Sequence, residues 1–199
     1  MIIYRSTDPA SDPITRAIAE ERLALGADFD QNVIDNLISE ATTQVELDTN
    51  ISVMQQEWTL ALQNWPRAET IHLPKGPLDE STGNGISSFT YTDGSGATQT
   101  LIEDTDFRVS AVGDKIRLTP IGNGWPVDVA DREDYPDPIK IVYDTGKSTA
   151  DGWQISAVLI RIHYLYTLGQ IDSDKAYQSI IKKHKDYTNY YVLNAEVWL

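Results

Sequence analysis

The amino-acid sequence predicts an α+β protein, in which a helical bundle carries a small antiparallel β domain inserted between its second and third helices. Apolar residues recur with helical spacing before residue 50, alternate with polar residues from residue 55, and return to helical spacing after Gly146. An extended C-terminal arm follows the last helix. The predicted parts are N-terminal helices (1–53), the inserted β domain (54–148), C-terminal helices (149–188) and the arm (189–199).

Composition is typical of a globular protein. The 199 residues are 41% hydrophobic and 23% charged and contain no cysteine, which excludes collagen, disordered chains and disulfide scaffolds. Thirty acidic and sixteen basic residues give a formal net charge of −14, which disfavours binding to nucleic acid phosphates. The longest apolar stretch, 155–168, is interrupted by Arg161 and His163, so no segment has the ~20 apolar residues of a membrane helix.

Two helices are predicted before the β domain. Asp12 and Pro13 form an N-cap and first-turn pair, and the helix that follows ends at Gly26. Its apolar side is expected to comprise Ile14, Ala17 and Ile18. Asp30 is expected to cap a second, amphipathic helix that runs to about Asp48. Its apolar side is expected to comprise Val33, Ile34, Leu37, Ile38, Ala41 and Val45.

The middle of the chain consists of short segments with strand-like alternation. They are QQEWTLALQ, ETIHLP, GISSFTYT, ATQTLI, FRVSA, KIRLTP and PIKIVYDT. Turn-forming residues from Asp93 to Gly96 predict a hairpin between two of these segments. Such short strands favour a small sandwich or barrel, with residues 76–85 and 122–138 forming polar surface loops.

Helical spacing returns after the β domain. Residues 153–168 are apolar on most of the helix circumference, which predicts a central helix that ends at Gly169. Asp172 or Ser173 is then expected to cap a last, basic helix over residues 174–187.

Residues for catalysis or metal binding are scarce. His72, His163 and His184 have no metal-ligating partner three or four positions further along the chain, and no G-x-S-x-G motif is present. We therefore predict no catalytic residue, no metal and no cofactor, and expect structural roles for the histidines. One acidic loop has enough carboxylates for calcium but lacks the spacing of an EF-hand, which favours a solvated loop. Its residues are Asp128, Asp131, Glu133, Asp134 and Asp137.

The C-terminal arm is the strongest candidate for a partner-binding segment. It gathers large apolar and aromatic side chains where a monomer commonly has a polar tail. These residues are Tyr190, Tyr191, Val192, Leu193, Val197, Trp198 and Leu199. The arm either folds back as an edge strand of its own domain or adds to the sheet of another subunit or partner.

The order of several segments resembles the head-tail connector proteins of tailed bacteriophages, also called adaptor or head-completion proteins. The resemblance covers roughly residues 28–168. It lies in the Gln56-Glu57-Trp58 strand, Leu73-Pro74, the Tyr91–Gln99 hairpin leading to Asp106-Phe107-Arg108-Val109, Thr119-Pro120 and Trp125-Pro126.

The resemblance implies a structural virion protein of the neck, made in the host cytoplasm. It implies a ring, typically of twelve subunits, that binds the portal protein on one side and a stopper or tail-completion protein on the other. DNA would pass through the channel of this ring without sequence-specific contacts, and an acidic wall would prevent it from sticking. No membrane contact and no enzymatic activity are implied, and the C-terminal arm would reach the portal.

A carbohydrate- or ligand-binding module of a viral or bacterial surface protein is the alternative. Aromatic side chains suit stacking on sugar rings if they are exposed. The candidates are Trp58, Trp65, Trp125, Tyr135 and Trp153.

Overall fold

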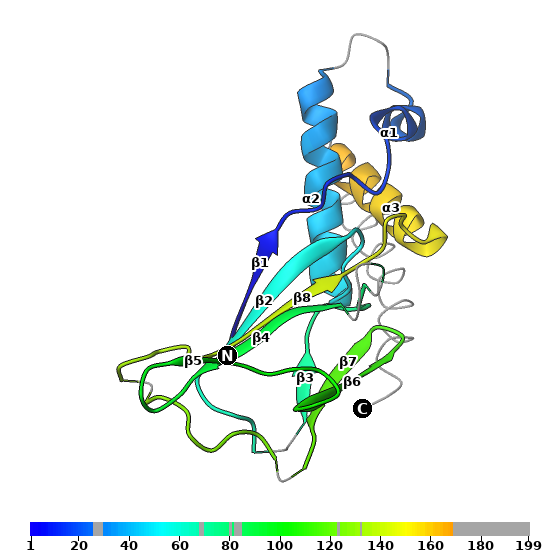
Figure 1. The fold of residues 1–199 in the computed structure, drawn as a ribbon. Helices are drawn as coiled ribbons and strands as arrows, with labels where there is room; N and C mark the ends of the chain where they lie inside the picture. The colour runs from blue at the N-terminus through cyan, green and yellow to red at the C-terminus, as the bar shows by residue number, and fades with distance from the viewer. Residues whose placement is uncertain are drawn as a thin grey trace. The chain divides into compact units, whose positions relative to one another are not determined.

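A computed structural model describes residues 1–25, 30–67, 70–79, 81, 85–122, 124–131 and 133–168 (Figure 1). The chain divides into two compact units. We call them the β unit (Met1–Ala10 and Gln55–Lys147) and the helical unit (Ser11–Met54 and Ser148–Leu199). Over the described ranges, no helix has the length and apolar character needed to cross a membrane. The α+β class is confirmed: the described part contains three helices and two antiparallel sheets.

The larger sheet of the β unit has five antiparallel strands in the order β1-β2-β8-β4-β5. Its strands are β1 (Ile2–Thr7), β2 (Gln56–Leu62), β4 (Ile86–Thr92), β5 (Thr98–Thr100) and β8 (Ile139–Thr145). Strands β2 and β8 pair along their whole length, so Trp58 lies opposite Tyr143 and Leu60 opposite Ile141. Residues distant in sequence thus form the centre of the sheet.

The smaller sheet has three antiparallel strands in the order β3-β7-β6. They are β3 (Ile71–Leu73), β6 (Phe107–Val112) and β7 (Lys115–Pro120). Side chains alternate across this sheet, with Ile116 and Leu118 buried and Arg117 between them exposed. One side of the smaller sheet is therefore apolar and the other is polar.

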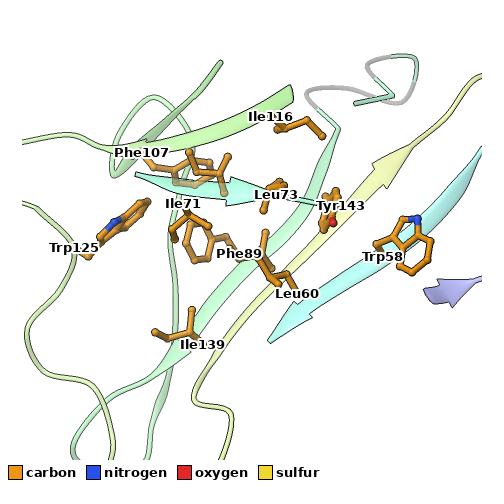
Figure 2. Packing of buried hydrophobic residues seen from close by; sticks show 12 residues of the cluster. Trp58, Leu60, Ile71, Leu73, Phe89, Phe107, Ile116, Trp125, Ile139 and Tyr143 are labelled. Carbon is orange, nitrogen blue, oxygen red and sulfur yellow. The ribbon is translucent and has the colours of Figure 1, made fainter. Parts of the chain in front are cut away.

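The apolar sides of the two sheets share one core (Figure 2). Phe89 and Ile139 from the larger sheet meet Ile71 and Phe107 from the smaller one, and each is at most 3% exposed. The Tyr143 hydroxyl donates a hydrogen bond to the carbonyl of Pro74, just after β3, which links the sheets by a polar contact as well. The β unit is thus a small two-layer sandwich.

Strand β1 corrects the prediction for the N-terminus. The sequence predicts helices for residues 1–53, but Ile2–Thr7 pair antiparallel with β2 and belong to the β unit. Arg5 lies opposite Trp58, and its guanidinium carbon is 5.2 Å from the centre of the indole ring. This strand pairs with residues fifty or more positions away, so local sequence gives little sign of it.

The helical unit contains α1 (Arg16–Leu23), α2 (Gln31–Thr49) and α3 (Gly152–Leu168), and α2 packs against both other helices. Helix α1 begins later than predicted, because its N-cap is Thr15 and not Asp12. The Thr15 hydroxyl accepts a hydrogen bond from the backbone N–H of Ile18 at 3.4 Å. Its buried side also differs from the prediction: Ala19 is buried, whereas Ile18 is 43% exposed.

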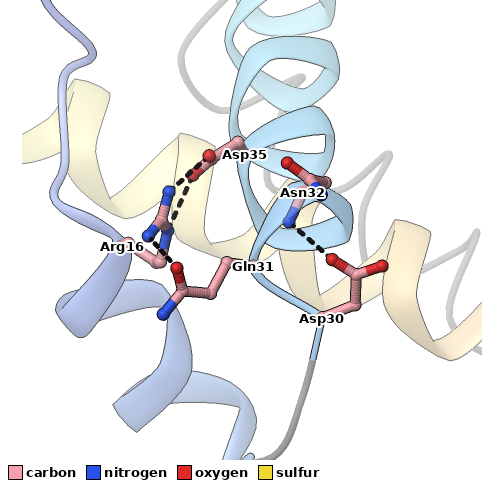
Figure 3. A network of polar contacts seen from close by, with 5 residues as sticks. All are labelled: Arg16, Asp30, Gln31, Asn32 and Asp35. Atoms are coloured by element: carbon pink, nitrogen blue, oxygen red, sulfur yellow. Dashed lines mark hydrogen bonds and ion pairs between the residues drawn. The ribbon is translucent and has the colours of Figure 1, made fainter.

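Helix α2 begins at the predicted cap. The Asp30 carboxylate accepts a hydrogen bond from the backbone N–H of Asn32 at 2.9 Å. Further along α2, the Asp35 carboxylate accepts two hydrogen bonds from the Arg16 guanidinium of α1 (Figure 3). The Arg16 guanidinium lowers the pKa of Asp35 through these hydrogen bonds. Both side chains are well exposed, so the pair orients α1 on α2 and adds little stability.

The core of the helical unit is built from α2 and α3. Ile34 and Ile38 of α2 and Val158 and Ile162 of α3 are at most 1% exposed and belong to one cluster. Asp48 near the end of α2 forms an ion pair with Arg161 of α3. The predicted last helix, residues 174–187, lies outside the described residues.

A buried carboxylate, that of Glu46, binds the backbone of the segment that follows α2. Glu46 is 3% exposed, and its Oε1 accepts a hydrogen bond from the backbone N–H of Val53 at 2.8 Å. We expect Glu46→Ala to lower the free energy of unfolding by about 1–3 kcal/mol, because a buried N–H loses its acceptor. Glu46→Gln retains an acceptor oxygen and should cost less. Urea titration measures both, and Glu40→Ala, an exposed change in the same helix, should have almost no effect.

Candidate functional site

The predicted acidic loop lies beside the hairpin formed by β4 and β5. The backbone N–H of Ala130 donates to the carbonyl of Thr92 at 2.9 Å, and the N–H of Thr92 donates to the carbonyl of Pro138 at 2.8 Å. A β-carbon on Gly94 would lie 2.5 Å from Oδ1 of Asp128, so the loop touches the turn of the hairpin. The loop and the hairpin therefore form one surface of the β unit.

The turn of this hairpin is organised by Asp93. Its Oδ1 accepts hydrogen bonds from Ser95 N at 2.9 Å, Ser95 Oγ at 2.6 Å and Ala97 N at 3.0 Å, and its Oδ2 accepts one from Gln99 Nε2 at 2.7 Å. Gly96 has a φ of +84°, which glycine adopts without strain, and a β-carbon there would lie 2.6 Å from the Tyr135 hydroxyl. The hairpin predicted from Asp93 to Gly96 is present.

These hydrogen bonds, chiefly the one from the Ser95 hydroxyl, lower the pKa of Asp93 from 3.8 to about 2. A carboxyl group with a lowered pKa stabilises the fold while it is ionised. Its contribution is therefore complete above pH 3.8 and is lost as the pH falls through about 2. We expect the natural protein to be more stable to unfolding than Asp93→Asn above pH 3.8, and this difference to decrease as the pH falls to about 2.

Thermal melts at several pH values measure that difference, and side-chain NMR gives the midpoint of the Asp93 titration. Thr98→Ala, at an exposed and uncharged position of the same hairpin, is the control, and its stability difference from the natural protein should not change with pH over this range. A midpoint for Asp93 near 4, the usual value of an aspartate, would contradict the hydrogen-bonded turn.

Most of the predicted acidic residues are exposed, and their loop lies beside the end of β4 and the turn of the hairpin. We call this surface the acidic edge: the exposed Asp128, Asp131, Glu133 and Asp134, together with the half-buried Asp93 of the adjoining turn. Asp137, the remaining predicted residue, is only half-exposed. The pKa of neighbouring Tyr91 is raised, first by desolvation and then by the charges of Asp93, Asp128 and Asp106. The negative charges of Asp93, Asp128 and Asp106 therefore act on the Tyr91 side chain of β4.

The carboxylates do not converge as metal ligands do. Among the described residues, no group of three or more His, Asp or Glu side chains is placed to hold a metal ion. The Asp131 carboxylate instead accepts a hydrogen bond from the backbone N–H of Glu133 at 3.1 Å, which shapes the loop. The arrangement presents separate negative charges to solvent, and such a surface attracts cationic partners and repels nucleic acid.

The aromatic residues proposed for sugar stacking are mostly used in packing. Trp58 and Trp125 are each 9% exposed and belong to the core of the sandwich. Trp65 stacks on Trp125 with ring centres 5.1 Å apart and planes 9° from parallel. Trp153 is half-buried, and of the five only Tyr135 is well exposed, at 41%. Trp58 and Trp125 therefore lack the exposure on which the sugar-binding alternative depends.

The predicted partner-binding residues of the C-terminal arm, from Tyr190 to Leu199, lie outside the described residues. Sequence analysis missed another surface, the polar side of the smaller sheet, which carries Arg108 and Arg117. Apolar and polar residues alternate in FRVS and KIRLT, which indicates that both arginines lie on the polar side of their strands.

Comparison with known proteins identifies the fold. No protein-family model matches the chain, and no curated protein does. Solved structures do match. A chain in the virion of a native gene transfer agent particle has a TM-score of 0.66 at 17% identity, with 87% of both chains covered.

Two further matches come from necks of such particles. A chain from the neck of the empty particle, computed with C6 symmetry, has a TM-score of 0.67 at 17% identity. A chain from the neck of the native particle, computed with C12 symmetry, has a TM-score of 0.67 at 16% identity. Each covers 87% of this chain and 86% of its own. This chain therefore shares its fold, over most of its length, with proteins of a particle neck.

Proposed function

We propose that this chain is a structural virion protein of the neck, an adaptor ring that joins the portal vertex of a capsid to the tail. The observation that carries the proposal is the match of fold, over 87% of the chain, to neck chains of gene transfer agent particles. The order of elements supports it, since the β strands from β2 to β8 lie in sequence between α2 and α3. A helical bundle with an inserted β domain is the architecture implied by the resemblance to phage adaptors.

The charge of the chain suits a wall around passing DNA. With a net charge of −14, a ring of copies repels phosphates, so DNA passes without sticking.

The proposed partners are the portal protein, a stopper or tail-completion protein, and further copies of the chain, twelve in a ring in keeping with the C12 symmetry of a matched neck. In this account the arm at 189–199 reaches the portal or a neighbouring subunit. The protein acts by assembly and has no catalytic role, cofactor or membrane contact.

The size of the assembled protein tests this proposal against the carbohydrate-binding alternative. We expect the chain to form a ring, either in solution or on isolated capsids, when its mass is measured by mass photometry or native mass spectrometry. Glycan-array binding by a protein that stays monomeric, with no copies retained on capsids, would contradict the adaptor role.

A further inference from the structure

The solvent-facing side of the smaller sheet is basic in an otherwise acidic protein. The alternation of side chains places Phe107, Ile116 and Leu118 in the core and leaves Arg108 and Arg117 exposed. None of the residues that form β3, β6 and β7 is acidic. This composition is unexpected for a chain with nearly twice as many acidic as basic residues.

The register of the strands joins these positions into one surface. Arg117 is paired with His72 on one side and with Ser110 on the other, and Arg108 is paired with Thr119 in the next row. Paired residues of antiparallel strands project from the same side of a sheet. We call the resulting surface the basic face: His72, Arg108, Ser110, Arg117 and Thr119, all of them exposed.

The two arginines of the basic face have no carboxylate partner within the described part of the chain. Ion pairs in that part of the chain include those of Arg5, Arg16 and Arg161. Arg108 and Arg117 form none. An arginine presents a planar set of donors that matches a carboxylate, so both side chains are available to an acidic partner.

The basic face and the acidic edge are well separated on the β unit. In Figure 1, β5 lies on the left and the hairpin of β6 and β7 on the right. The basic face is also the side of its sheet that points away from the shared core. The two surfaces therefore do not neutralise each other within one copy.

We propose that the basic face of one copy docks on the acidic edge of the next copy, as a subunit contact of the ring. This inference rests on the proposed function. A contact between two different surfaces of identical chains is heterologous, and such contacts generate a ring when the rotation between copies closes. Placing opposite charges at each contact also offsets the repulsion among strongly acidic chains.

A second copy fits the basic face better than duplex DNA does. The acidic edge supplies carboxylates, which pair with guanidinium groups, on every copy of the same chain. DNA contact would instead bring phosphates toward a protein with a net charge of −14. Docking between copies should therefore be sensitive to salt, since exposed charges are screened at high ionic strength.

A charge exchange tests the contact in the full-length protein. One variant carries Arg108→Glu and Arg117→Glu, and the other carries Asp128→Lys, Glu133→Lys and Asp134→Lys, which reverses the net charge of the acidic edge. The readout is the number of copies retained per capsid, measured by quantitative mass spectrometry. Each variant alone places like charges at every contact and should reduce retention about tenfold or more.

A mixture of the two variants is the decisive sample. Every contact in an alternating ring then brings opposite charges together, so retention should return to the natural level. A control with Arg67→Glu and Lys140→Glu changes two exposed cations of the β unit outside the basic face and should assemble normally. Circular dichroism melts confirm that each variant is folded.

Several results would overturn the inference. Normal retention of either variant alone, or failure of the mixture to recover, excludes this contact while leaving the adaptor role intact. Binding of a labelled DNA duplex that is lost with Arg108→Glu and Arg117→Glu, in rings that otherwise assemble, would assign the basic face to DNA. Absence of the natural chain from capsids would instead contradict the proposed function itself.

Discussion

Replacing Phe89 by alanine should lower the free energy of unfolding by about 3–5 kcal/mol. Phe89 is 1% exposed, and its ring centre lies 5.1 Å from that of Phe107 and 5.4 Å from that of Trp125. It extends from the larger sheet, whereas Phe107 belongs to the smaller one, so its removal leaves a cavity between the layers. The β unit depends on this junction for its stability.

Urea titration, followed by tryptophan fluorescence, measures this loss. Phe89→Leu keeps most of the buried volume and should cost less than the alanine change. Val127→Ala, at a fully exposed position of the same unit, should leave the free energy of unfolding nearly unchanged. A loss below ~1 kcal/mol for Phe89→Ala would mean that the two sheets do not share a core.

Deleting residues 189–199 should abolish attachment while leaving the fold of the purified chain nearly intact. The deleted segment is rich in aromatic and apolar side chains, each of which gains roughly 1.5–3 kcal/mol on burial. In the adaptor account they are buried on the portal or a neighbouring subunit. Capsids made with the shortened chain should therefore fill with DNA and then lose it, or lack tails.

Electron microscopy of particles and a thermal melt of the purified protein measure the two effects of this deletion. A chain without residues 189–199 that no longer folds would show that the arm completes its own domain as an edge strand. Normal particles with tails would show that the arm is dispensable. A substitution of Glu196 by Gln, which changes the charge of the arm but keeps its apolar residues, is the matched control.

Local signals were sufficient for several elements of the fold. Asp30 precedes a long amphipathic segment and caps α2 as predicted, and Asp93 to Gly96 form the predicted hairpin. In both places the residues that define the structure are neighbours in sequence. The sequence could therefore specify them without knowledge of the rest of the chain.

Features that depend on distant partners could not be predicted in the same way. Strand β1 exists because it pairs with β2, and nothing within IIYRST indicates that partner. Trp125 lies in a polar loop in the sequence, yet it is buried against Trp65 and Phe89. The separation of the acidic edge from the basic face likewise depends on the pairing of strands, although the alternation of charged residues was visible.

A cryo-electron microscopy map of an assembled particle, with this chain located in it, tests the adaptor account most directly. The account predicts a ring of copies at the neck, between the portal and the tail, with the arm of each copy in contact with the portal or with an adjacent subunit. A chain found outside the neck, or absent from complete particles, would contradict it.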